Sequence, residues 1–170
     1  MNQAATEREQ LISHLNGTVS EAVLFFSSMD GDFFDGHQTA RAVLSHLVFW
    51  HREYCSITQD LLKGNNLKLL KGSQALLNER AFCEYRSTSM SDLAACLTNF
   101  QKVFTTNLRC LDNWDANFPF KMGCRKTDVG GRVRTIERHI RHHLTRQQRA
   151  HQRGIDWINA YYPQEDTKHP

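Results

Sequence analysis

Three histidines lie in the ten-residue segment IERHIRHHLT, residues 136–145. His139 and His143 are four residues apart, so on a helix they lie on one face, one above the other. This face also carries isoleucines, so we expect both imidazoles to point inward, whereas His142 falls on a polar side that faces solvent. Two neutral imidazoles one turn apart can hold a divalent metal ion through bonds of about 2.1 Å. The segment therefore predicts half of a metal site.

A third ligand must come from another helix, and the segment SHLVFWHREY, residues 45–54, supplies two candidates. His46 and His51 both flank the apolar face of this segment, and periodicity does not choose between them. No HExxH motif is present, which excludes the built-in glutamate base of many metalloproteases. A chain with nine histidines also produces the HxxxH spacing by chance. The alternative is that these histidines only pack in the core or lie on a basic surface.

Three histidines on a divalent ion leave a coordination position open for water or substrate. The metal could then make hydroxide available near neutral pH, or bind and activate a thiolate. Few other side chains are suited to acid–base chemistry. The candidates are His51, as a proton shuttle, and Gln147, which lies one turn after His143 and could hydrogen-bond a ligand.

Helical periodicity recurs in four long segments, and no alternating apolar segment of strand length stands out. Thr39 is a suitable N-cap for the second helix, and Ser89-Met90-Ser91-Asp92 fits a capping box before the third. The predicted helices span about residues 4–29, 39–63, 93–114 and 132–160, with a short extra helix over 76–82. This pattern predicts an all-α, antiparallel four-helix bundle with a long connection between its second and third helices. We expect one domain over residues 1–163 and a frayed tail over 164–170.

The net charge of +3 is unevenly distributed. Residues 121–153 contain ten Lys or Arg and two acids. Rows of cations bind phosphates, so nucleic-acid binding is one possible use of the last helix, although we favour a solvated surface or subunit contact. The arginines of this row are Arg132, Arg134, Arg138, Arg141, Arg146, Arg149 and Arg153.

Five cysteines without a CxxC pair argue against a zinc ribbon or a redox dithiol. Cys124 lies among basic residues, which could make it reactive. The chain contains no run of about 18 apolar residues, so no membrane-spanning helix is expected. Glu7 and Glu9 stand where a signal peptide would carry a basic region and an apolar core. We therefore expect a cytoplasmic protein.

Two segments resemble the DinB/YfiT-like four-helix bundles. DGHQTARAVLSHLVFWHREY, residues 35–54, resembles their loop and second helix, where an Ala/Ser-His-Leu step precedes a tryptophan. RHIRHHLTR, residues 138–146, resembles their last helix, where one histidine follows another by four residues. The stretch HLVFWH is similar to the ClbS/DfsB branch, which includes colibactin self-resistance proteins. The resemblance extends loosely over most of the chain, including LLNERAF at residues 76–82.

The resemblance implies an up-down-down-up bundle, often dimeric, whose divalent metal is held by three histidines. Carried onto this chain, these ligands are His46, His139 and His143, which favours His46 over His51. Zinc or nickel suits such a ligand set. Gln38 stands where the family often has tryptophan, so we expect the entrance to the site to have a different shape.

Related bundles imply a function in stress or toxin resistance. We expect a homodimeric hydrolase or thiol transferase that acts on a small electrophile, with a low-molecular-weight thiol as cosubstrate and without a membrane or nucleic-acid partner. One alternative is a ClbS-like protective protein that sequesters a reactive toxin, in association with DNA. The other is a bundle that has lost its metal and serves as an interaction module.

Overall fold

The computed structural model describes residues 3–161, and for residues 4 and 155–161 it describes the backbone alone. These residues form five α-helices and no named strand. The helices are α1 (Gln3–Ser27), α2 (Ala40–Leu62), α3 (Gln74–Tyr85), α4 (Met90–Cys110) and α5 (Val129–Tyr161). The all-α class is confirmed, and the short extra helix is α3. The frayed tail predicted for residues 164–170 lies outside the described residues.

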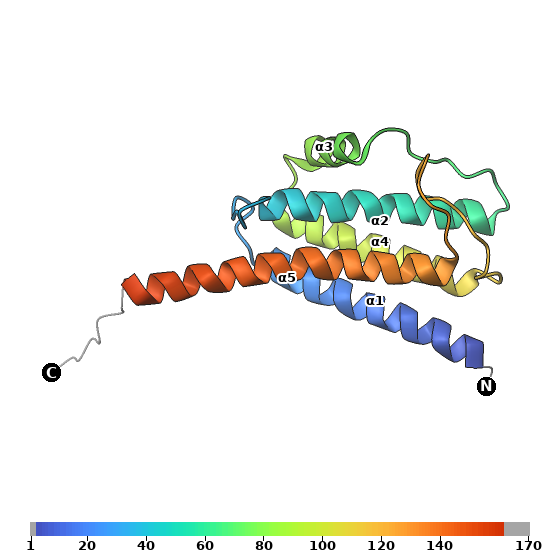
Figure 1. The fold of residues 1–170 in the computed structure, drawn as a ribbon, viewed down its shortest axis with the longest axis horizontal. Coiled ribbons are helices and arrows are strands. Elements are labelled where there is room, and N and C mark those ends of the chain that lie inside the picture. The colour runs from blue at the N-terminus through green and yellow to red at the C-terminus, as the bar shows by residue number, and fades with distance from the viewer. Residues whose placement is uncertain (1–2, 162–170) are drawn as a thin grey trace.

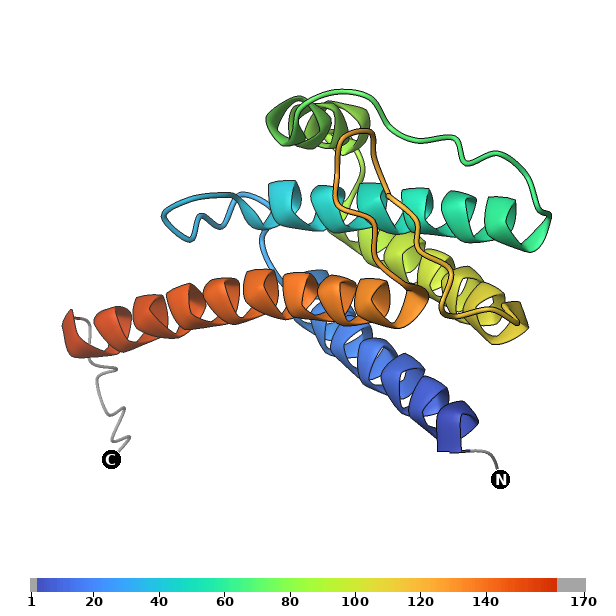
Figure 2. The same ribbon diagram turned by 45° about the vertical axis from the view of Figure 1, so that its right-hand side comes forward.

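The four long helices pack as in a bundle, with α2 against α4 and α1 against both α4 and α5 (Figure 1). α3 lies on the outside of α2 in both ribbon views (Figure 2). α5 contains 33 residues and extends past the other helices. No helix in the described part of the chain is long and apolar enough to cross a membrane.

Side-chain caps fix where the helices begin. Thr39 caps α2 by accepting a hydrogen bond from the Ala42 amide, and Ser89 caps α4 in the same way from Asp92. Both caps were predicted from the sequence. α5 begins at Val129, three residues before the expected start at Arg132, because the Asp128 carboxylate accepts a hydrogen bond from the Gly131 amide at 2.5 Å.

α4 ends at Cys110, before the predicted end at 114. The backbone becomes extended at Leu111, and the Trp114 indole donates a hydrogen bond to the Leu108 carbonyl. Trp114 is therefore buried against the end of the helix rather than within it.

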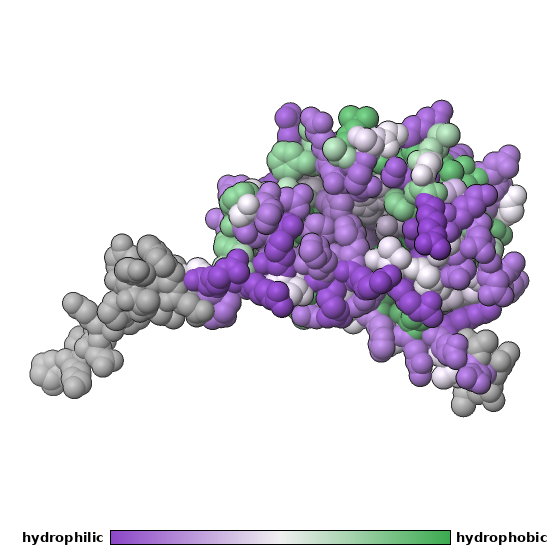
Figure 3. Space-filling model, in the orientation of Figure 1, coloured by the Kyte–Doolittle hydropathy of each residue, from purple (hydrophilic) through white to green (hydrophobic). Residues whose placement is uncertain are grey.

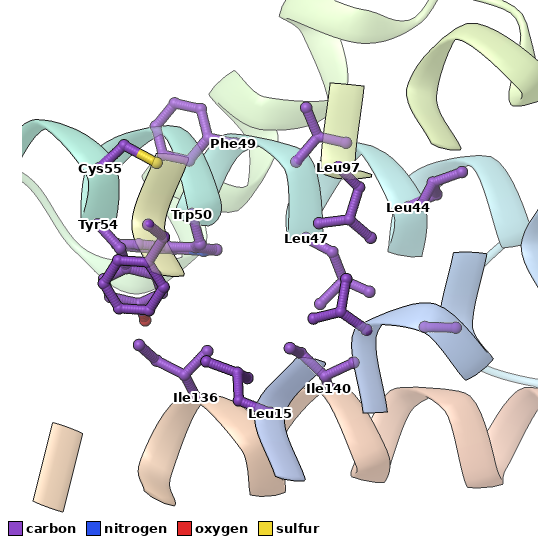
Figure 4. Close-up of a cluster of buried hydrophobic side chains, with 14 of the residues drawn as sticks. Leu15, Leu44, Leu47, Phe49, Trp50, Tyr54, Cys55, Leu97, Ile136 and Ile140 are labelled. Atoms are coloured by element: carbon purple, nitrogen blue, oxygen red, sulfur yellow. The ribbon is translucent and has the colours of Figure 1, made fainter. Parts of the chain in front are cut away.

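The core lies between the four long helices, where leucines and isoleucines from each of them meet (Figure 4). Complete burial of such a side chain contributes about 1.5–3 kcal/mol to stability. The residues drawn there include Leu15 of α1, Leu44 and Leu47 of α2, Leu97 of α4, and Ile136 and Ile140 of α5.

The two long connections meet beside α2 and α3. Residues 111–128 fold back as a loop, in which Phe118 and Thr127 exchange backbone hydrogen bonds. The Met122 amide donates to the Leu70 carbonyl at 2.9 Å and so joins this loop to the connection between α2 and α3. This arrangement brings residues 118–120 over the start of α5, next to the histidines.

Candidate metal centre

Three histidines from two helices converge on one point. The Nε2 atom of His139 lies 3.0 Å from the Nε2 atoms of both His46 and His143. His46 comes from α2, and the other two come from adjacent turns of α5. One ligand atom from each residue lies within 4.8 Å of the other two, and the three residues could hold a metal ion. His142 is exposed, as its helical position predicted.

The spacing of these nitrogens fits a metal ion. Bonds of about 2.1 Å at tetrahedral angles place two ligand nitrogens about 3.4 Å apart. The two observed separations of 3.0 Å need only a small outward movement of the rings to reach this value. His46, His139 and His143 are therefore already gathered in the arrangement that a divalent ion would require.

Burial keeps the imidazoles neutral. Burial, together with the neighbouring His139, lowers the pKa of both His46 and His143 to about 3. The pKa of His139 is also lowered, first by burial and then by His142. Neutral imidazole is the form that binds a metal, because the ligand nitrogen must be unprotonated.

An ionic contact fixes α2 against α5 at this end of the bundle. Asp35, in the loop before α2, accepts a hydrogen bond from Arg146 Nε at 2.5 Å and two more from backbone amides. Arg146 also donates to the Gln38 side chain, and Gln147 donates to the Gln38 carbonyl. These contacts hold the start of α2 on α5 and thereby set the distance between His46 and His143.

The histidines lie in the wall of a cavity of about 420 Å³. α2 contributes Trp50 and Tyr54, α3 contributes Asn78, and the loop before α5 contributes Phe120. Gln74 and Gln38 also line this cavity, together with Arg132, Thr135 and the three histidines. A small molecule could enter the cavity and contact the cluster, with Gln38 at one edge of the site.

Two buried nitrogens of the cluster, Nδ1 of His46 and Nδ1 of His143, find no hydrogen-bond partner among the residues that the structure describes. The same is true of Trp50 Nε1, next to them in the cavity wall. Buried polar atoms in native structures are almost always hydrogen-bonded. The site is therefore polar and incompletely satisfied in the protein alone, as expected of a place that binds a ligand.

Searches with protein-family models, among curated proteins and among solved structures found no match to this chain.

The structure separates the two candidate histidines of α2. His51 faces α4, where its Nε2 lies 3.1 Å from Gln101 Oε1, and its Nδ1 lies 3.0 Å from the Leu47 carbonyl of α2 itself. It is 1% exposed and does not line the cavity. A role as a proton shuttle stays a prediction, and the structure places His51 behind the cavity wall.

Gln147 is fully buried, and its amide nitrogen donates a hydrogen bond to the Gln38 carbonyl at 3.1 Å. Its Oε1 has no partner, but Gln147 is not part of the cavity lining. Its predicted contact with a ligand therefore stays a prediction. Cys124 accepts hydrogen bonds from the Phe120 and Lys121 amides through its sulfur, and its predicted reactivity is equally untested.

The sequence did not single out Arg132, Asn78 or Phe120 for this site. Arg132 was counted in the exposed basic row, but it is 5% exposed and lines the cavity. Its position could have been found from helical spacing, because residues 132, 135, 139 and 143 form one stripe of α5. Arg134, Arg138 and Arg141 of α5 are exposed, and Figure 3 shows hydrophilic side chains over much of this face of the molecule.

Proposed function

We propose that this protein is a metal-dependent enzyme that acts on a small electrophile, by hydrolysis or by thiol transfer. The observation that carries the proposal is the convergence of three neutral imidazoles in the wall of a cavity, where the Nε2 atom of His139 lies 3.0 Å from the Nε2 atoms of the other two. Three nitrogen ligands and an open side are typical of catalytic rather than structural metal sites.

The ligands would be His46, His139 and His143, and zinc or nickel suits them best. When bound, such an ion lowers the pKa of a coordinated water or thiol and so supplies a nucleophile near neutral pH. The residues of the chain itself would bind the substrate and exclude water from it. Trp50 and Phe120 pack edge to face, with ring centroids 5.4 Å apart, and form one apolar wall, while Asn78 provides an amide that can orient a substrate.

We also propose an up-down-down-up bundle of the DinB-like type. Figure 1 supports this topology, because α2 and α4 begin at one end of the bundle and α1 and α5 begin at the other. The ligand positions in α2 and α5 agree with the motifs of that family. A homodimer, a cytoplasmic location and a function in stress resistance stay predictions.

The experiment that tests the proposal is metal content, measured by elemental mass spectrometry on tag-free protein. We expect about one zinc or nickel ion per chain in the wild type and in the control His142→Ala, whose imidazole is exposed. The ion should be lost in both His46→Ala and His139→Ala. Equal metal content in all four proteins, or none in the wild type after incubation with zinc and nickel, would contradict the metal site.

Turnover is then measured on the metal-loaded protein. The two substrates are a nitrophenyl ester for hydrolysis, and chlorodinitrobenzene with a low-molecular-weight thiol for thiol transfer. Activity should be present in the wild type and in His142→Ala, and it should be absent in His139→Ala. Metal binding without either activity would reject the enzymatic part of the proposal and leave a metal-binding protein.

A further inference from the structure

Arg132 is a buried cation without a carboxylate partner. Its side chain is enclosed by aromatic rings, with the guanidinium carbon 4.6 Å from the centroid of Phe120 and 5.8 Å from that of Phe118. One of its terminal nitrogens donates to the carbonyls of Phe118 and Arg125, at 3.4 and 3.3 Å. Within the described residues, no Asp or Glu forms an ion pair with it.

Part of the guanidinium remains unused. Nε is buried, and the described residues provide no hydrogen-bond partner for either Nε or Nη1. Burial lowers the pKa of Arg132, and the nearby Tyr54 and Cys124 only partly oppose this effect. A buried charge is usually neutralised by an ion pair, because removal from water is costly. The missing counter-charge is therefore an observation that points to a ligand.

The surroundings of Arg132 favour an acceptor-rich group. Arg132, Tyr54 and Trp50 all line the cavity that contains the histidine cluster. Burial raises the pKa of Tyr54 to about 12, so its hydroxyl keeps its proton and can donate a hydrogen bond. Trp50 Nε1 is a second buried donor that no described residue accepts from. The cavity thus offers several hydrogen-bond donors to one incoming molecule.

The charge balance selects a monoanion. Arg132 is the only Lys or Arg among the described residues that line the cavity. One guanidinium balances one negative charge, and its planar donors match the two oxygens of a carboxylate. A phosphate dianion would leave one negative charge uncompensated at the Arg132 end of the cavity.

We propose that Arg132 binds the carboxylate of a substrate whose other end reaches the histidine cluster. This inference rests on the proposed function and names the class of its substrate. Arg132 and His139 are at positions i and i+7 of α5, about 10 Å apart along the helix axis. The substrate is therefore an elongated monocarboxylate, with a thiol or electrophilic group at the end opposite to the carboxylate. The wall between the two ends includes Trp50 and Phe120, which suits an apolar middle.

The test compares two probes of equal chain length, 8-mercaptooctanoate and 8-mercapto-1-octanol, which carry a carboxylate and an uncharged alcohol at the end opposite to the thiol. Their affinities are measured by titration calorimetry under reducing conditions, first on metal-free and then on zinc-loaded protein. In the metal-free wild type we expect the carboxylate to bind about 10-fold more tightly than the alcohol, as charge-assisted hydrogen bonds to a buried arginine predict. Arg132→Gln should remove this preference, and the control Arg134→Gln, on the exposed side of α5, should retain it.

Equal affinities of the two probes in the wild type, or a preference that survives Arg132→Gln, would overturn the inference. If Arg132→Gln fails to fold, as judged by circular dichroism, Arg132→Lys replaces it. That variant keeps the charge but loses the planar donors, and an undiminished preference there would also overturn the inference.

The zinc-loaded titrations separate this result from the proposed function. Zinc should tighten binding of both thiols in the wild type, because a metal-bound thiolate is gained whatever the charge at the far end. No gain for the alcohol would count against the metal chemistry, while a carboxylate preference in metal-free protein would still support the Arg132 subsite.

Discussion

Metal binding should stabilise the folded chain by an amount that follows from the site and from the chain length. The perturbation is addition of zinc or nickel to metal-free protein, compared between the wild type and His139→Ala. His139 is the central member of the cluster, since its Nε2 contacts both other ligands. Its removal leaves one ligand on α2 and one on α5, without the atom between them.

The expected shift is several degrees. A ligand that binds only the folded state at 100 times its Kd adds about 2.7 kcal/mol to the free energy of unfolding. For a chain of 170 residues, each kcal/mol moves Tm by about 2–4 °C. The wild type should therefore gain about 5–10 °C. His139→Ala should gain less than about 2 °C, because the loss of one ligand weakens the site strongly.

The assay is thermal unfolding followed by circular dichroism, with and without the metal. His142→Ala is the matched control, because it removes a neighbouring but exposed histidine and should retain the full shift. Mg²⁺ should give no shift, since it prefers oxygen ligands. A wild-type Tm that zinc and nickel leave unchanged would refute the reasoning, and so would an equal shift in His139→Ala.

Two further predictions concern the framework of the site. Burial lowers the pKa of His51 to about 4, whereas the unfolded chain titrates near 6.5, so unfolding takes up a proton between these values as pH falls. As the pH falls from 7.5 to 5, this histidine should lower the free energy of unfolding by about 2 kcal/mol. The free energy of unfolding measured in urea should therefore depend less on pH in His51→Gln than in the wild type. An equal pH dependence in the two proteins would contradict the lowered pKa of His51. Asp35→Ala removes the buried partner of Arg146 and should destabilise the protein by about 2–4 kcal/mol and weaken zinc binding. The exposed Asp32→Ala is its control, and equal losses in the two variants would argue against the ionic contact.

Periodicity predicted the helices well because each long helix has one apolar face, and α2 and α4 also have recognisable N-caps. Thr39 and Ser89 begin α2 and α4 where side-chain capping predicted. The expected boundary was wrong at Gly130-Gly131, which were expected to precede the last helix and instead lie in its first turn. The Asp128 carboxylate accounts for this, because it supplies the hydrogen bond that the new helix start needs.

The sequence by itself determined that the chain is helical, that His139 and His143 share an inward face and that His142 does not. These properties depend only on helical geometry and on neighbours along the chain. The sequence could not choose between His46 and His51 without a family resemblance, because both flank the same apolar stripe of α2. The choice depends on which neighbouring helix packs against each side of this stripe. Tertiary packing places His46 against α5 and His51 against α4.

The sequence alone also could not assign Arg132 to the site. As one of a row of arginines it is indistinguishable in sequence from its exposed neighbours. Only the fold-back of residues 118–120 onto α5 buries it beside the cavity. Local spacing thus fixed which side chains share a helix face, whereas the packing of distant segments decided which of them meet at the site.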